Sequence, residues 1–152
     1  MVGFSDASHK FHPVAIAVSS NENKWMYRAL LTILRDNEYA PQVVLADGCS
    51  SITDAVAAVY PNAIRAMCWA HAARAMDRKL SSVPLDHRRV LRDDINNLQL
   101  SVDTAQFERA AELMREKWRR DFGQIESAMA FEDYFYREWI CGPLRFWYAR
   151  LA

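Results

Sequence analysis

The sequence predicts an α/β body followed by an all-helical segment, and two patterns carry this prediction. The middle of the chain alternates short apolar runs with helical stretches in the order strand–helix–strand–helix, which favours parallel strands covered by helices. From residue 84 onward, apolar residues recur at helical spacing without a strand pattern. We therefore expect an α/β core over residues 1–83, with three to four strands in one mixed sheet, and a helical region over residues 84–152.

The N-terminal residues predict a β-hairpin. Val2–Ser5 is a short apolar stretch, and the following Asp-Ala-Ser at 6–8 has the composition of a turn. Residues 11–19 (FHPVAIAVS) predict the second strand. Because proline cannot donate to a sheet, Pro13 indicates an edge position or a bulge.

A helix and a strand should follow the hairpin. Asn21 or Asn23 can cap the helix, whose apolar residues are Trp25, Leu30, Leu31 and Leu34. Val43–Ala46 is a continuous apolar run, as expected for a buried strand.

Two more helices and one strand complete the predicted body. After the Asp-Gly turn at 47–48, Ser50 or Ser51 can cap a helix with Ile52, Val56 and Val59 on one face. Residues 63–68 (AIRAMC) predict a strand, and a helix follows at once over about residues 69–80.

The helical region is rich in aromatic residues. Apolar side chains recur at helical spacing at Phe107, Ala111, Met114 and Trp118. Later aromatic residues are Phe131, Tyr134, Phe135, Tyr136, Trp139, Phe146, Trp147 and Tyr148. Such side chains can stack on unpaired bases, but they more often form the core of a helical bundle, which is the interpretation we favour.

Composition excludes some classes of protein. Lys plus Arg equals Asp plus Glu at 19 each, which argues against a dedicated nucleic-acid binder but leaves room for local basic clusters. No run approaches the ~18 apolar residues of a membrane span. The three cysteines give an odd number and no disulfide framework, which suits a reducing compartment.

Asp47 is the first candidate site residue. It follows the apolar run Val43–Ala46, and open α/β sheets bind ligands at the C-terminal ends of their strands. The simpler interpretation is that Asp47 and Gly48 only form a turn.

Cys68 and His71 form a Cys-x-x-His motif at the start of a predicted helix. Two ligands do not make a zinc site, because structural zinc needs four and catalytic zinc needs three plus water. Cys49 could be a third ligand and His87 or Cys141 a fourth, although the spacing matches no zinc signature. A buried thiol and a helix-capping imidazole explain the motif equally well.

Basic residues gather in two groups. The first contains Arg74, Arg78 and Lys79, followed by His87, Arg88, Arg89 and Arg92; the second contains Arg115, Lys117, Arg119 and Arg120. Either group could neutralise phosphates. The ordinary interpretation is solvated helix faces with acidic neighbours such as Asp93, Asp94 and Glu116.

Taken together, the motifs resemble the catalytic domain of Mutator-like (MULE) transposases. The matching segments are Phe-His-Pro-Val-Ala-Ile-Ala-Val, a helix bearing Trp25, Val-Leu-Ala-Asp-Gly, Ile-Thr-Asp-Ala, Val-Tyr-Pro, Arg-Ala-Met-Cys-Trp-Ala-His and Phe-Trp-Tyr-Ala-Arg. The combination of Asp-Gly with Cys-x-x-His at this spacing is the most specific part of the resemblance.

This resemblance implies an RNase H-like fold and DDE chemistry. In such enzymes three carboxylates hold two Mg²⁺ or Mn²⁺ ions, which activate water or a 3′-hydroxyl for attack on a DNA phosphodiester. Asp47 matches the second acid and would be a metal ligand, while Cys68 and His71 match the family motif near the active site. The resemblance also implies DNA as partner, possible assembly into homo-oligomers, no membrane and, for a eukaryotic element, the nucleus.

Two acids of the family pattern have no counterpart here. The first Asp belongs on a strand before residue 1 and the third Glu after residue 152, whereas Asp6, Glu126, Glu132 and Glu138 fall at the wrong places. We therefore expect a fragment of a transposase that is inactive alone; the alternatives are a non-catalytic DNA- or protein-binding remnant and a zinc-binding module. Without the first strand, Val2–Ser5 should pair directly with Val43–Ala46 under strain, or the sheet should have a gap.

Overall fold

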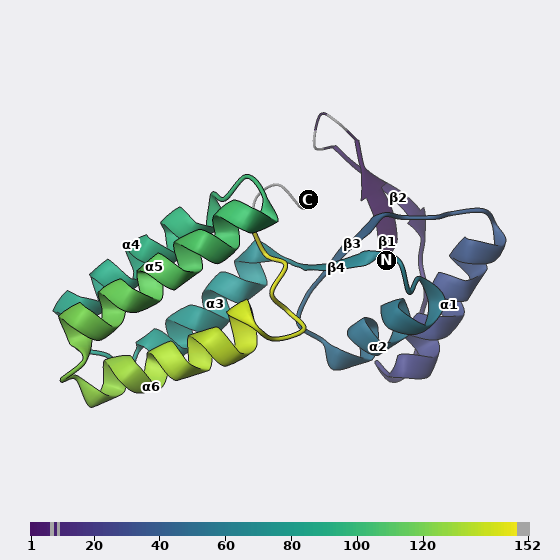
Figure 1. Cartoon of the computed structure of the whole chain (residues 1–152). Coiled ribbons are helices and arrows are strands. Elements are labelled where there is room, and N and C mark those ends of the chain that lie inside the picture. The colour runs from purple at the N-terminus through teal and green to yellow at the C-terminus, as the bar shows by residue number, and fades with distance from the viewer. Residues whose placement is uncertain (7, 9, 149–152) are drawn as a thin grey trace. The chain divides into compact units, whose positions relative to one another are not determined.

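The computed structural model describes residues 1–6, 8 and 10–148 (Figure 1). The chain divides into two compact units. The first contains Met1–Pro41 and Ser50–Asn62, and the second contains Gln42–Cys49 and the described residues from Ala63 onward. Each unit is described separately below.

The first unit opens with the predicted hairpin. Strand β1 (Val2–Ser5) pairs antiparallel with β2 (Phe11–Ala15). In the turn, Asp6 Oδ1 accepts hydrogen bonds from the backbone N–H groups of Ser8 (2.9 Å) and Lys10 (3.0 Å). The register shifts beside Pro13, which confirms the predicted bulge, although β2 ends before the predicted Ser19. Ala7 of the predicted turn lies outside the described residues.

Helices α1 (Lys24–Asp36) and α2 (Ser50–Val59) pack against each other in the same unit. Asn23 caps α1, as its side chain accepts hydrogen bonds from the N–H groups of Trp25 and Met26. Leu31 and Leu34 are buried, whereas Trp25 is 67% exposed. Helix α2 begins at Ser50, which puts Ser50 and Ser51 in its first turn and not at the cap.

The second unit contains the parallel pair that the sequence predicts. Strand β3 (Val43–Ala46) pairs with β4 (Ile64–Met67) in continuous register. Two further backbone hydrogen bonds lie at the ends of this β3–β4 ladder. The Ile64 N–H donates to the Gln42 carbonyl and the Cys68 N–H donates to the Ala46 carbonyl, each at 2.8 Å. The expectation of a fully buried β3 is wrong: Leu45 is 52% exposed, since this sheet has only two strands.

The described strands do not form one mixed sheet of three to four strands. They form two separate two-stranded sheets, β1–β2 and β3–β4. Val2–Ser5 therefore does not pair with Val43–Ala46, and the described strands show the other alternative expected from the sequence, an interrupted sheet. What the structure confirms is a mixed α/β chain with small sheets.

Four helices and a π-helical turn follow β4: α3 (Trp69–Leu80), α4 (Leu85–Gln99), α5 (Thr104–Phe122), α6 (Glu126–Phe135) and η1 (Tyr136–Ile140). Helix α4 packs on α5, and α6 contacts both α5 and α3. From Pro84 to Tyr148 the described residues form no strand, which confirms the predicted helical segment. None of the described helices is long and apolar enough to cross a membrane.

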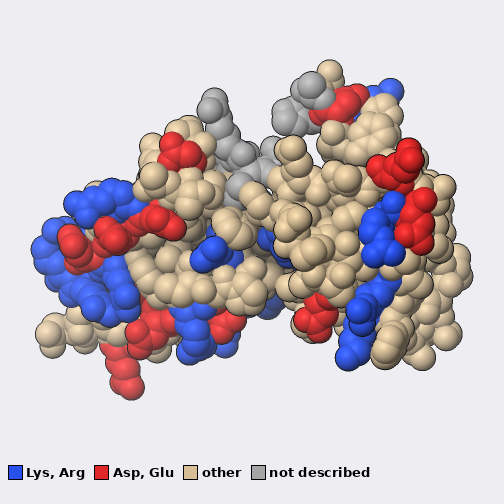
Figure 2. All heavy atoms as spheres, turned by 45° about the vertical axis from the view of Figure 1, so that its right-hand side comes forward, with Lys and Arg blue, Asp and Glu red and all other residues tan. Residues whose placement is uncertain are grey.

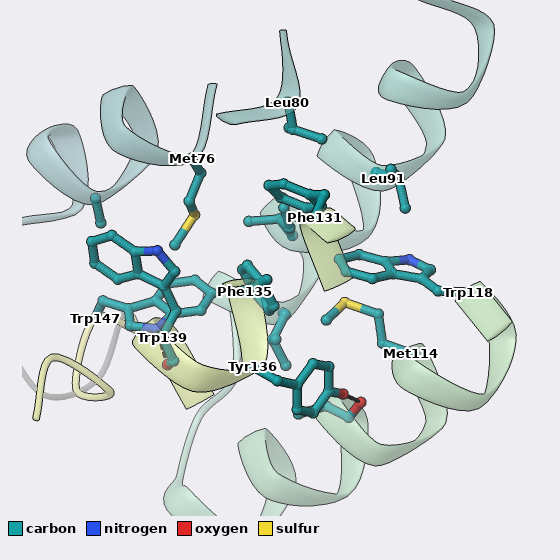
Figure 3. Packing of buried hydrophobic residues seen from close by; sticks show 14 of the residues in the cluster. Met76, Leu80, Leu91, Met114, Trp118, Phe131, Phe135, Tyr136, Trp139 and Trp147 are labelled. Carbon is teal, nitrogen blue, oxygen red and sulfur yellow. Dashed lines mark hydrogen bonds between the residues drawn. The ribbon is translucent and has the colours of Figure 1, made fainter. Parts of the chain in front are cut away.

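The aromatic residues form the core of this helical region (Figure 3). Trp118 and Phe135 are fully buried with ring centroids 5.5 Å apart. Phe131, Trp139 and Trp147 are also buried in this cluster. The prediction of a bundle core is confirmed, and burial leaves almost no surface of these rings exposed for stacking on bases.

The chain returns from the helices to the sheet after η1. The turn closes with the Cys141 N–H donating to the Tyr136 carbonyl at 2.9 Å, and the Trp147 indole N–H donates to the Trp139 carbonyl at 2.8 Å. The Met67 N–H then donates to the Phe146 carbonyl at 2.6 Å. This bond fixes the returning segment beside the end of β4. Residues 149 and 150 of the Phe-Trp-Tyr-Ala-Arg motif lie outside the described residues.

Candidate functional site

Asp47 occupies the turn that follows β3. Its Oδ1 accepts a hydrogen bond from the Cys49 N–H at 3.0 Å, so the simple turn interpretation of Asp47 is realised in the structure. Asp47 is exposed, and its carboxylate therefore avoids the free-energy cost of desolvation. Among the described residues, Oδ2 accepts no hydrogen bond, which leaves it available to a ligand.

A cleft of about 440 Å³ lies beside Asp47 within the second unit. Its lining combines one carboxylate, three cationic or titratable side chains of α3 and an apolar remainder. The lining residues are Asp47, Gly48, Cys49, Met67, His71, Arg74, Ala75, Arg78, Trp139 and Leu144. The structure thus brings four predicted site residues, Asp47, His71, Arg74 and Arg78, to one place.

The spacing of the α3 residues explains how they share the cleft. His71, Arg74 and Arg78 follow one another at intervals of three and four residues, which places them on one face of a helix. All three side chains are exposed. Within the described part of the chain none of the three forms an ion pair, so the face is positively charged beside a single carboxylate.

The Cys-x-x-His motif spans the junction of β4 and α3. Cys68 is half-buried at the N-cap position of α3, where its side chain makes no capping hydrogen bond. Cys68 does not line the cleft, whereas His71 does. In residues 1–6, 8 and 10–148, no three His, Cys, Asp or Glu side chains form a group suited to a metal ion.

Comparison with known protein families identifies the N-terminal part of the chain. Residues 1–75 match the family model of the MULE transposase domain. Residues 1–75 therefore belong to a MULE transposase domain. No curated protein matches the chain.

The MULE match covers part of the cleft. Asp47, Cys68, His71 and Arg74 lie within the matched residues, whereas Arg78, Trp139 and Leu144 lie beyond them. Residues beyond the match therefore supply one end of the α3 face, through Arg78, and part of the apolar lining, through Trp139 and Leu144. Sequence reasoning missed Trp139 and Leu144 at the site, because only the return of the chain to β4 brings them there.

Sequence reasoning also missed Arg65, which lies within the matched residues. Its side chain is only 8% exposed, and it donates hydrogen bonds to the carbonyls of Ala46, Ala66 and Asp47. Burial lowers the pKa of the Arg65 guanidinium, while the nearby Asp47 and Cys49 raise it. The signal in the sequence is an arginine inside an otherwise apolar strand, Ile-Arg-Ala-Met.

Lys79, the third predicted DNA-binding residue, does not line the cleft. Its ammonium lies 5.3 Å from the centroid of the Tyr134 ring, in a cation–π contact. The structure therefore separates Lys79 from Arg74 and Arg78, although the three are close in sequence.

The second basic group is neutralised by acids. Arg115 and Arg119 both pair with the buried Glu132, at 2.5 and 3.2 Å. Lys117 pairs with Asp94 at 2.7 Å, and Arg120 contacts Asp121 at 2.8 Å. Figure 2 shows acidic and basic side chains lying next to one another on the face in view. The ordinary interpretation of this group, charged helix faces with acidic neighbours, is confirmed.

The glutamates considered as third acids do not line the cleft. Glu132 is occupied by Arg115 and Arg119, Glu138 pairs with Arg137 at 3.0 Å, and Glu126 is exposed in the first turn of α6. Among the lining residues Asp47 is the single carboxylate.

Proposed function

We propose that the cleft binds the phosphate backbone of DNA, as part of a DDE-type transposase with an RNase H-like fold. Arg74 and Arg78 neutralise phosphates, His71 contacts the same backbone, and Asp47 is the second catalytic acid. The same proposal places a boundary between residues 83 and 84, which separates the α/β core from the helical region. It also includes a nuclear location and the formation of homo-oligomers. The family match supports a transposase, and the cleft supports the assignment of these residues.

The observation that carries the proposal is the contrast between the two basic groups. A cation already paired with a carboxylate loses that interaction when it binds a phosphate, whereas an unpaired one does not. Arg74 and Arg78 are unpaired in the described structure and line the cleft beside Asp47, while Arg115, Lys117 and Arg119 are held by acids. Each phosphate contact releases counterions from DNA and contributes to affinity.

A two-metal site with Mg²⁺ or Mn²⁺ belongs to the same proposal, but the described residues do not fit it by themselves. Asp47 supplies one carboxylate, and no cluster of three potential ligands surrounds it in the described ranges. The Arg65 guanidinium, bound to the Asp47 carbonyl, already places a positive charge beside Asp47. We therefore derive no catalytic step through a metal from these residues.

Salt-dependent DNA binding tests the proposal. The double variant Arg74→Gln/Arg78→Gln should bind a short duplex more weakly. Its log–log salt slope should be shallower by about 0.9 for each phosphate that is no longer neutralised, hence by about 1.8 for both. Fluorescence anisotropy at several salt concentrations measures the affinity and the slope.

The matched control removes the same charge elsewhere. Arg109 and Arg120 are exposed, and each pairs with an acid in its own helix. Arg109→Gln/Arg120→Gln should leave the slope nearly unchanged. Equal losses of affinity in both double variants would mean that DNA responds only to net charge, and the cleft would lose its assignment.

The second candidate is a non-catalytic DNA- or protein-binding remnant of a transposase. The observation that favours it is the single carboxylate in the cleft. It predicts DNA binding that is indifferent to Asp47→Asn. Metal-dependent nicking of DNA by this protein, abolished by Asp47→Asn, would exclude this candidate.

A further inference from the structure

Arg65 joins the ends of the two parallel strands through backbone carbonyls. Its Nη1 donates to the Ala46 carbonyl at 3.3 Å and also to the Ala66 carbonyl, and its Nη2 donates to the carbonyl of Asp47. Because Ala46 is the last residue of β3, the guanidinium holds the position at which the chain leaves the strand and enters the Asp47 turn.

Sheet stability alone does not explain a charged residue here. Arg65 is almost fully buried, and no carboxylate forms an ion pair with it in the described structure. Its Nε is buried without a hydrogen-bond partner. Buried charges and unsatisfied donors cost free energy, and apolar residues of similar volume are often as stable or more stable.

Arg65 donates a hydrogen bond to Asp47, the residue that the proposed function assigns as a catalytic acid. The Asp47 peptide is fixed at its carbonyl by Arg65, and its carboxylate is fixed at Oδ1 by the Cys49 N–H. These two bonds define the turn and the direction of the remaining carboxylate oxygen. Arg65 itself does not line the cleft, so it acts through Asp47.

We propose that Arg65 is a positioning residue that fixes the Asp47–Cys49 turn at the edge of the cleft. Its importance for activity rests on the proposed function of that cleft. Arginine suits this role because its rigid planar fork presents N–H donors on separate nitrogens in a fixed geometry, whereas the three donors of lysine sit on one flexible ammonium.

Amide hydrogen exchange of the whole chain, measured by NMR without DNA, tests the proposal. In Arg65→Met the Cys49 amide should exchange about tenfold faster, as expected for a local opening. The Ile64 amide, which bonds to the Gln42 carbonyl at the other end of the ladder, should change much less. A purely structural role would accelerate both amides by the same factor.

Arg88→Met is the matched control. Arg88 also donates to backbone carbonyls, those of Ser81 and Val83, each at 2.9 Å, but it lies far along the chain from the turn. This variant should leave the Cys49 amide unchanged.

If Arg65→Met does not fold, Arg65→Lys tests the positioning role of Arg65 instead. The lysine variant should fold and still show faster exchange at Cys49 than the wild type. Wild-type exchange at Cys49 in this variant, or failure of both variants to fold, would overturn the proposal. Since no DNA is present, failure here is distinct from failure of the Arg74/Arg78 binding experiment, which tests the proposed function.

Discussion

At the scale of single residues, Glu132 shows how the helical region neutralises a buried carboxylate with ion pairs. Its carboxylate is 2% exposed and accepts hydrogen bonds from Arg115 at 2.5 Å and Arg119 at 3.3 Å. Arg115 also lies 4.3 Å from the centroid of the Tyr136 ring. One buried acid therefore holds two cations of α5 against α6.

Replacing Glu132 with alanine should destabilise the protein. The change leaves a cavity and separates two arginines from their acceptor, and breaking a buried pair costs about 3–5 kcal/mol. Because the arginine side chains are 38% and 54% exposed, solvent reduces this to about 2–3 kcal/mol of the free energy of unfolding. Urea denaturation measures it.

Glu112→Ala is the comparison for Glu132→Ala. Glu112 pairs with Arg109 on the surface, where both side chains are about two-thirds exposed, and such pairs contribute ~0–1 kcal/mol. Equal effects of the two substitutions would show that Glu132 is not a buried acceptor in solution.

At the scale of secondary-structure elements, the capping residue of α1 gives a sharp test. Asn21 and Asn23 are equally good caps by sequence, and the structure selects Asn23, which accepts from the Trp25 and Met26 N–H groups at 3.0 and 3.1 Å. Asn23→Ala should lower the free energy of unfolding by about 1 kcal/mol. Asn21→Ala should change it by less than about 0.5 kcal/mol. Thermal melting that ranks the two variants the other way would contradict this assignment.

Helices and strands with a strong local sequence pattern could be predicted, but which of them lie side by side could not. The bounds of β3 and α3 agree with the sequence because a continuous apolar run and helical spacing are local signals. Strand pairing depends on distant residues, so the expectation of one mixed sheet failed. The role of Arg65 was equally hidden, since it depends on carbonyls 18 and 19 residues earlier in the chain. At the site, Asp47, His71, Arg74 and Arg78 could be predicted from motifs, but Trp139 and Leu144 could not.

At the scale of the whole molecule, the two units differ in how many apolar side chains they bury. The second unit has a large aromatic core that includes Trp118, Phe131 and Phe135. The buried residues of the first are fewer and mostly small or aliphatic, such as Leu31, Leu34 and Val56.

Native-state hydrogen exchange should reveal this difference. Local opening free energies follow buried apolar contacts, so amides of α1 and α2 should exchange faster than those of α5 and α6. Exchange at the same rate in all four helices would indicate one cooperative structure and would contradict the prediction.

The bond between the Met67 N–H and the Phe146 carbonyl has a consequence for how this protein can diverge. It brings Leu144, which lies outside the family-matched residues, into the lining of a cleft whose acid lies inside them. Mutations at Leu144 or Trp139 can therefore change the size of the cleft while the Asp47 turn keeps its sequence. Paralogues could therefore differ in the shape of this cleft through changes in the late helical region, while the residues matched by the family model stay the same.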